Sequence, residues 1–262
     1  MRAFLLSLLW LLAGPALAQE KLVGTNMDVR TILNFKVADA AIQKLLPPGF
    51  EANPATSGPS AGANLRVTFV DQMAAHDATG KATPPVRNLI FGIPVRKPGS
   101  ETGGLMIFAG LSPAAGGPYG ASLKATNVVE RKVRHEPGGN SIVEESWEYK
   151  ADNGSSTTLQ IQYVRGTAAR EKGELRVYSQ SKPEFFRIYR FEQGVDVVRG
   201  AGTGPERLQK VTFKAAAVGT RFFFEESAGV TVYVFDGTGY TKEAFIKSAT
   251  LASAMKRYGA KP

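Results

Sequence analysis

Residues 146–164 read SWEYKADNGSSTTLQIQYV, and this stretch indicates the fold class more clearly than any other part of the chain. In SWEY (146–149) and in LQIQY (159–163), apolar residues alternate with polar ones. That period of two is typical of strands with one buried face. Between them, Asn153 and Gly154 form a step that favours positive φ and a tight turn. We therefore expect a β-hairpin here.

The same alternation recurs along the chain, first in LRVTF at 65–69. No rhythm of strand, helix and strand separates these segments, so we expect an antiparallel barrel or sandwich rather than a parallel sheet. The prediction is one mainly β (α+β) domain over residues 19–262, built as a closed antiparallel β-barrel. Further strands are expected at Thr31–Val37, Asn88–Pro94, Leu105–Leu111, Asn127–Arg134, Leu175–Tyr178, Glu184–Phe191, Lys210–Ala215, Phe222–Phe224 and Val230–Phe235.

Helical periodicity is found in two segments. Ala38–Leu46 places its apolar residues three and four apart and stops at Pro47, which cannot continue a helix. Thr241–Arg257 begins with a residue suited to an N-cap and ends with two cations, which the helix dipole favours. We therefore expect a short N-terminal helix and a longer C-terminal helix beside the barrel.

Residues 1–18 have the pattern of a secretory signal peptide. Arg2 supplies a positive charge, residues 3–13 form a short apolar run, and Ala16 and Ala18 are the small residues of a cleavage site. The alternative is a retained anchor, but the run is short for a membrane span, and no later segment reaches about 18 consecutive apolar residues. We expect a secreted or periplasmic protein without a membrane span.

Composition excludes several classes of chemistry. The chain of 262 residues has no cysteine and only two histidines, His76 and His135, which excludes disulfides and thiolate sites and disfavours a histidine metal centre. Its formal charge is +9, but the cations are scattered, and export argues against a nucleic-acid partner. The densest basic stretch, 131–134, is expected to be a solvated strand. Adhesion to an anionic surface, weakened by salt, is the alternative.

Three short motifs occur in an order that resembles the acetoacetate decarboxylase superfamily. The first is VADAAIQKLLPPGF (37–50), a short helix that ends in Leu-Pro-x-Gly. The second is Ile-Pro-Val at 93–95, where a strand ends. The third is GGPYGASLKA (116–125), a glycine–aromatic–glycine turn that leads to a lysine. The resemblance covers residues 31–133 best, and it implies a closed, mainly antiparallel β architecture around an internal cavity.

The resemblance also implies a reaction. In that family a lysine amine attacks a ketone and forms an iminium, which accepts electrons as a carbon–carbon bond breaks, without a cofactor or a metal. Lys124 is the lysine that follows the turn and would be the nucleophile; Arg87, Asn88 and Tyr119 would bind the substrate. Such a lysine must be neutral near pH 7, which a hydrophobic pocket and a neighbouring cation bring about in acetoacetate decarboxylase itself. The implied function is an exported carbon–carbon lyase that acts on a small keto acid.

Two positions differ from the family pattern and leave an alternative open. The family usually shows Pro-Lys-Lys after the turn, whereas this chain has Ser122-Leu123-Lys124. It usually has an acidic residue before the Ile-Pro-Val strand, whereas this chain has Asn88, which hydrogen-bonds but does not transfer protons. The alternative is a non-catalytic periplasmic barrel that binds a small apolar or carboxylated ligand. The oligomeric state stays open, with a homo-oligomer among the alternatives.

Overall fold

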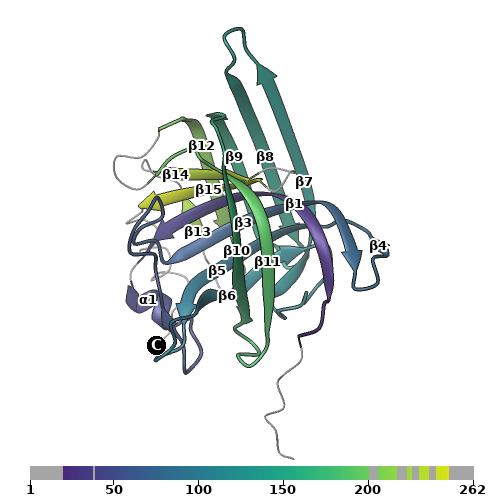
Figure 1. Ribbon diagram of the computed structural model, residues 1–262, viewed down its shortest axis with the longest axis vertical. Coiled ribbons are helices and arrows are strands. Elements are labelled where there is room, and N and C mark those ends of the chain that lie inside the picture. The colour runs from purple at the N-terminus through teal and green to yellow at the C-terminus, as the bar shows by residue number, and fades with distance from the viewer. Residues whose placement is uncertain are drawn as a thin grey trace, which may run out of the picture.

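Strands make up most of the described chain (Figure 1). The computed structural model describes residues 20–37, 39–200 and 206–216, and beyond them only the backbone of three further strands. The elements are β1 (Gly24–Lys36), α1 (Asp39–Gln43), β2 (Glu51–Ala52), β3 (Leu65–Asp77), β4 (Ala82–Thr83), β5 (Arg87–Arg96), β6 (Gly103–Ser112), β7 (Ser122–His135), β8 (Ser141–Ala151), β9 (Ser156–Val164), β10 (Ala169–Ser179), β11 (Phe186–Val197), β12 (Leu208–Ala216), β13 (Phe223–Glu225), β14 (Val230–Phe235) and β15 (Tyr240–Lys247).

The hairpin expected at 146–164 is present as β8 and β9. Trp147 lies opposite Leu159, and Tyr149 lies opposite Thr157, in an antiparallel ladder. The turn between them places Gly154 at φ 84°, in the left-handed region that glycine occupies without strain. Trp147, Tyr149 and Leu159 are fully buried, so the alternation in the sequence separates the buried face from the exposed one.

The strands divide into two parts, which we call the curled sheet and the wing. The curled sheet contains β1 to β6, β10, β11, β14 and β15, and the wing contains β7, β8, β9, β12 and β13. The wing is antiparallel throughout, but β1 with β15, β6 with β10, β6 with β7 and β11 with β15 are parallel pairs. The sheet is therefore mainly antiparallel, with four parallel pairs that the alternation in the sequence does not indicate.

The sheet is a curled half-barrel that stays open, which corrects the prediction of a closed barrel. It divides at β6, where Gly104–Ile107 pair with β10 and Gly110–Ser112 pair with the start of β7. Because β7 leaves the curled sheet at this point and carries the wing with it, the strands continue in two directions instead of closing one ring. Figure 1 shows the β7–β8 hairpin extending well beyond the curled sheet.

The helices are shorter than predicted. The first is the five-residue α1. The second prediction, Thr241–Arg257, was wrong where the chain is described, because 240–247 is strand β15, between β1 and β14 in the sheet. Partners on both sides satisfy the β15 backbone and override a weak helical propensity. Residues 248–257 lie outside the described residues, as does the predicted signal peptide. In the described part of the chain, no helix is long and apolar enough to cross a membrane.

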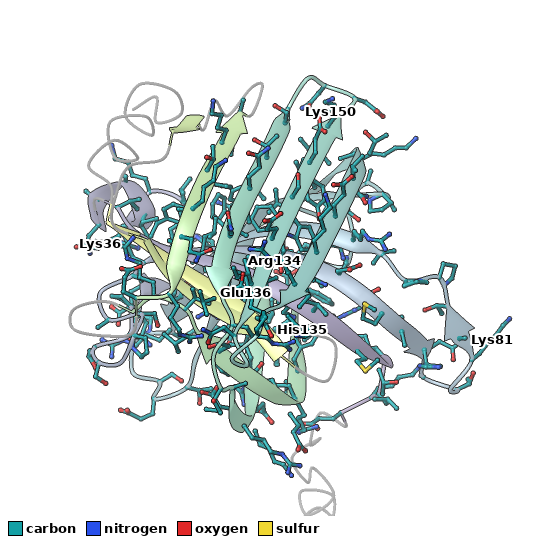
Figure 2. The ribbon with its side chains drawn as sticks, turned by 90° about the horizontal axis from the view of Figure 1, so that it is seen from above. Lys36, Lys81, Arg134, His135, Glu136 and Lys150 are labelled. Atoms are coloured by element: carbon teal, nitrogen blue, oxygen red, sulfur yellow. The ribbon has the colours of Figure 1, made fainter. Side chains whose placement is uncertain are left out.

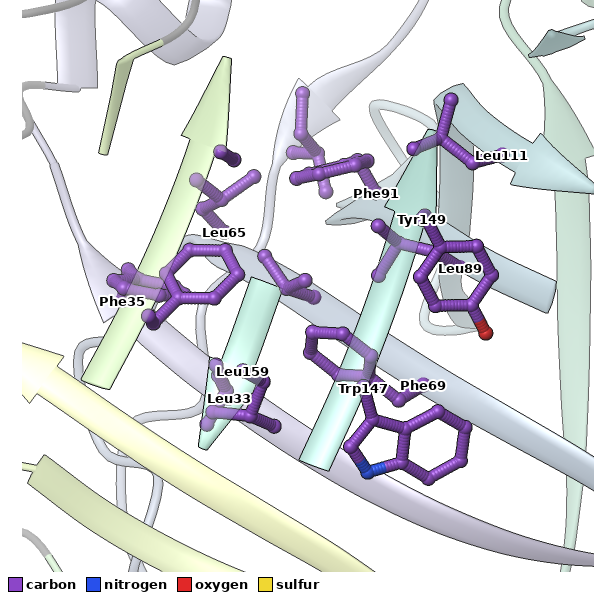
Figure 3. Packing of buried hydrophobic residues seen from close by; sticks show 14 of the residues in the cluster. Leu33, Phe35, Leu65, Phe69, Leu89, Phe91, Leu111, Trp147, Tyr149 and Leu159 are labelled. Carbon is purple, nitrogen blue, oxygen red and sulfur yellow. The ribbon is translucent and has the colours of Figure 1, made fainter. Parts of the chain in front are cut away.

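The core lies between the wing and the curled sheet. The rings of Phe69 and Trp147 lie 5.4 Å apart, and Phe213 of the wing contacts both Phe69 and Phe35 with centroids 6.1 and 5.6 Å apart. Figure 3 shows Trp147 and Tyr149 on the wing facing Phe35 and Phe69 on the curled sheet. Truncating such a buried ring typically costs about 3–5 kcal/mol, so this contact holds the two parts together.

A buried carboxylate joins the same two parts. The side chain of Glu145 in β8 is 0 % exposed, and it accepts hydrogen bonds from Thr31 Oγ1 in β1 (2.6 Å) and from Trp147 Nε1 (3.1 Å). Arg131 Nε in β7 donates to it at 2.9 Å, and an Arg131 Nη1 lies 3.9 Å from Asp71 in β3. Because a buried charge needs a partner, these contacts fix how the wing sits on the curled sheet.

Candidate functional site

Strand register places two of the predicted site residues in one row. Val70 lies opposite Arg30 on one side and opposite Asn88 on the other. The β5–β6 ladder continues this row to Ser112, and Ser112 lies beside Lys124 in the parallel β6–β7 pair. Residues opposite one another in neighbouring strands point to the same face of a sheet. Arg30, Asn88 and Lys124 therefore share the face that is turned away from the wing core.

The turn at 116–120 places Tyr119 on this face too. Gly116, Gly117 and Gly120 have φ of 80°, 60° and 68°, which a side chain would strain. Tyr119 is buried, and it packs in a cluster that includes Ile90, two residues from Asn88 on the same strand. The glycine–aromatic–glycine motif thus forms a tight turn whose aromatic ring lies against the row.

The Tyr119 hydroxyl donates a hydrogen bond of 2.8 Å to the hydroxyl of Tyr189 in β11. Burial, and then the neighbouring Tyr189 hydroxyl, raise the pKa of Tyr119 well above its usual value. It therefore stays a neutral donor over the physiological range. We call the side of the curled sheet that carries Arg30, Asn88, Tyr119 and Tyr189 the tyrosine face.

Arg30 supplies the positive charge of the tyrosine face. Its guanidinium forms an ion pair with Asp28 at 2.9 Å and interacts electrostatically with Tyr189 and Tyr119. Burial opposes the charge, but Asp28 outweighs it and the pKa of Arg30 is raised. The Nε atom of Arg30 is buried and has no hydrogen-bond partner among the described residues. A buried unpaired donor is costly, so this atom is suited to bind an acceptor from a ligand.

Asn88 presents the complementary group. Its Oδ1 atom is also buried without a partner among the described residues. It lies two strands from Arg30, a spacing of about 10 Å at the usual distance between strands. An unpaired acceptor and an unpaired donor on one face could together hold a small polar molecule, with the Tyr119–Tyr189 pair beside them.

Arg87, the neighbour of Asn88, lies on the opposite face. Its Nε atom is 2.9 Å from Asp71, and its side chain is 48 % exposed. This follows from the alternation of side chains along a strand, which prevents consecutive residues from sharing a face. Arg87 thus joins Asp71 beside the wing core, and the structure does not bring it together with Asn88 and Tyr119.

Lys124 lies at the start of β7, at the end of the row. Its side chain is exposed, and no described group makes an ion pair or a hydrogen bond with its ammonium. One strand, β6, lies between it and Asn88. The residue before it, Leu123, is 42 % exposed and carries no charge.

Sequence reasoning missed Arg30 and Tyr189. Arg30 lies two residues before the buried Ile32 and therefore on the same face, which was a usable signal, but the strand was expected to begin only at Thr31. Among the other charged residues on these strands, Arg66 lies on the side of Arg30 and its Nε donates to Asn34 Oδ1 at 3.2 Å. Glu130 lies on the outer face of the wing, beside a shallow depression away from the tyrosine face. Among the described side chains, no group of three potential metal ligands occurs.

The curled sheet with its wing, and the glycine turn that positions Tyr119, define an acetoacetate decarboxylase-like fold. One solved structure with this likeness is "Enduracididine biosynthesis enzyme MppR complexed with pyruvate", at 12% identity over 85% of this chain and 89% of that one, with a TM-score of 0.50. Another is the acetoacetate decarboxylase of Legionella pneumophila, at 13% identity over 83% of each chain and a TM-score of 0.42. No family model and no curated protein matches the sequence.

Proposed function

We propose that the tyrosine face binds a small carboxylate-bearing molecule of the keto-acid class. The observation that carries the proposal is the buried Nε of Arg30, which has no partner within the described part of the chain and lies near the Tyr119–Tyr189 hydroxyl pair. A guanidinium matches the two oxygens of a carboxylate, and a phenol hydroxyl is a further donor. The Asn88 amide, on the same face, can hydrogen-bond a keto or hydroxyl oxygen. The pyruvate named for MppR supports this ligand class.

Calorimetric titration with pyruvate and acetoacetate tests the proposal. Arg30→Met removes the cation, and we expect binding at least about tenfold weaker, because charge-assisted hydrogen bonds are the stronger kind. Arg96→Met is the matched control, since Arg96 is exposed and pairs with Glu51 on the same curled sheet. The proposal fails if the Arg30 variant binds as tightly as the control, or if the unmodified protein binds neither acid.

A second candidate function is the lyase reaction through Lys124. The row that joins Asn88, Ser112 and Lys124 favours it, because a ligand held at Asn88 would lie about two strand spacings from the lysine. The amine would add to the ketone and expel water to form an iminium. The bond to the carboxylate would then break, its electrons would move to the iminium nitrogen, and carbon dioxide would leave. Protonation and hydrolysis of the enamine would release the product.

Reductive trapping separates the two functions. The protein is incubated with a panel of α- and β-keto acids and borohydride, and adducts are located by mass spectrometry. An adduct on Lys124 that is lost in Lys124→Ala would establish the lyase chemistry, with Lys150→Ala as an exposed control. An adduct on another lysine would contradict the role of Lys124. If a keto acid binds but forms no adduct, the lyase reaction is contradicted and only the binding function remains.

We also propose that the protein is exported. Support comes from the charge, apolar run and small residues of the segment 1–18 and from the lack of cysteine. An exported protein of this kind would meet its ligand in the periplasm or outside the cell.

A further inference from the structure

One edge of β7 has no partner strand along most of its length. On one side β7 pairs with β8 from Ala125 to His135. On the other side it pairs with β6 only at Ser122–Lys124, and in the described ranges no other strand joins it. Figure 1 shows this part of the hairpin projecting away from the curled sheet. A long open edge is a template for another strand.

Two backbone hydrogen bonds show which residues of β7 face that edge. Asp152 N–H donates to the Lys124 carbonyl at 3.4 Å, and Glu136 N–H donates to the Asn140 carbonyl at 2.8 Å. In an antiparallel ladder, bonded residues alternate with residues whose N–H and C=O point away. The even-numbered residues of β7 thus bond to β8. The outward-directed groups belong to Ala125, Asn127, Val129, Arg131, Val133 and His135.

We propose that β7 pairs with β7 of a second copy of this chain, antiparallel about a two-fold axis at Arg131. In this register Val129 lies opposite Val133 of the second copy, and Glu130 lies opposite Lys132 of the second copy. Both contacts occur twice because of the symmetry. The valines form the hydrogen-bonded pairs. Glu130 and Lys132 occupy the closer non-hydrogen-bonded positions, where cross-strand side chains interact most strongly.

The neighbouring registers are less favourable. If the two-fold axis lies at Glu130 instead, Glu130 lies opposite Glu130 of the second copy. If the axis lies at Lys132, Lys132 lies opposite Lys132 of the second copy. Like charges directly opposite one another are destabilising. In the proposed register the only like pair is Arg131, and that side chain is already bound to Glu145 at 2.9 Å. The charge pattern of β7 therefore selects one register.

The side chains that would form the contact are available. Glu130 and Lys132 are exposed on the outer face of the wing, and neither makes an ion pair with a described group. Val133 is 42 % exposed and Val128 is 58 % exposed, although both lie in a strand. In Figure 2 the neighbouring residues Arg134, His135 and Glu136 lie together at the hairpin tip, and Lys150 lies at the other end of β8. Joining the edges would give one sheet continuous through two wings.

Analytical ultracentrifugation over a range of protein concentrations tests the dimer. Glu130→Lys and Lys132→Glu each create two like-charge pairs, so each should weaken the dimer about tenfold. The double variant Glu130→Lys/Lys132→Glu exchanges the charges and should restore dimerisation. Unmodified protein that stays monomeric up to about 0.5 mM, or single variants that dimerise like the unmodified chain, would overturn the proposal.

A backbone variant checks the edge itself. Val133→Pro removes an N–H that points to the open edge and leaves the hydrogen bonds to β8 intact. The dimer should therefore be lost, while the thermal midpoint stays near that of the unmodified chain. Arg134→Pro removes a bond to β8 and should lower the thermal midpoint. Hydrogen exchange supplies a second readout: the amides of Val129, Arg131 and Val133 should slow as concentration rises. A dimer in which they exchange at the monomer rate would use another surface.

Discussion

At the scale of single residues, two buried tyrosines keep their protons. Burial raises the pKa of Tyr119, with the Tyr189 hydroxyl as the next cause. Burial also raises the pKa of Tyr149, and the nearby Asp71 carboxylate adds to it. The Tyr149 hydroxyl has no hydrogen-bond partner among the described residues, so no hydrogen bond there offsets the cost of burying it.

These two pKa values predict an alkaline loss of stability. Above the unfolded value of about 10, the unfolded chain releases the phenol protons while the folded chain retains them, so stability falls as pH rises. Each tyrosine contributes up to about 1.4 kcal/mol per pH unit to this slope. Urea unfolding at pH 8–11 measures it. Tyr119→Phe and Tyr149→Phe should each flatten the decline, and an unchanged slope in both variants would contradict the prediction.

Part of the candidate site follows from the sequence. The glycine turn, Tyr119, Asn88 and Lys124 were found because short motifs carry them, and strand register places the last two in one row with Arg30. Which strands lie next to one another depends on contacts between distant segments, so the motifs could not show that Tyr189 meets Tyr119. Arg87 was placed with Asn88 by proximity in sequence, although alternation along a strand separates them.

At the scale of elements, Glu145 is the residue whose loss should most disturb how the wing packs. Glu145→Gln keeps the shape but removes the nearer of the two carboxylates that face Arg131, so we expect a loss of about 2–4 kcal/mol in the free energy of unfolding. Glu148→Gln is the control, because Glu148 lies three residues further along β8 and forms only an exposed pair with Lys150 at 2.5 Å. Equal effects of the two substitutions would contradict the role of Glu145.

The elements themselves were predictable where alternation is clear. The hairpin at 146–164 and the strand at 65–69 are present because their apolar residues define one buried face. Strand β15 was predicted as a helix because local spacing and end charges fit one, while its partners β1 and β14 lie elsewhere in the sequence. Local patterns report propensity, and tertiary pairing decides between competing states.

At the scale of the whole molecule, the export proposal makes a sharp prediction. Expressed in a host with a secretory pathway, the full chain should be found outside the cytoplasm with Gln19 as its first residue. Ala18→Leu, which replaces the small residue at the cleavage site, should accumulate the uncleaved form. Intact mass and fractionation measure both results. A full-length cytoplasmic product from the unmodified chain would contradict export.

The mainly β class could be predicted, but the closure of the sheet could not. Whether a sheet closes depends on which strand each edge meets, and here β6 pairs with β5, β7 and β10 at different points along its length. No pattern within residues 103–112 indicates three partners. If β6 paired with only two strands, the same set of strands could close into a barrel.

The pairing of β1 with β15 has a consequence for how the chain acquires its structure. Arg30 lies opposite Thr241, so β1, which is synthesised early, cannot form this pairing until β15 has been synthesised. The hairpin of β8 and β9 can form as soon as it emerges, whereas the curled sheet depends on a loop closure that spans most of the chain, which is a slow event. During synthesis, the β1 backbone therefore stays unpaired on that side. Under the export proposal, such a delay would keep the chain competent for transport across a membrane.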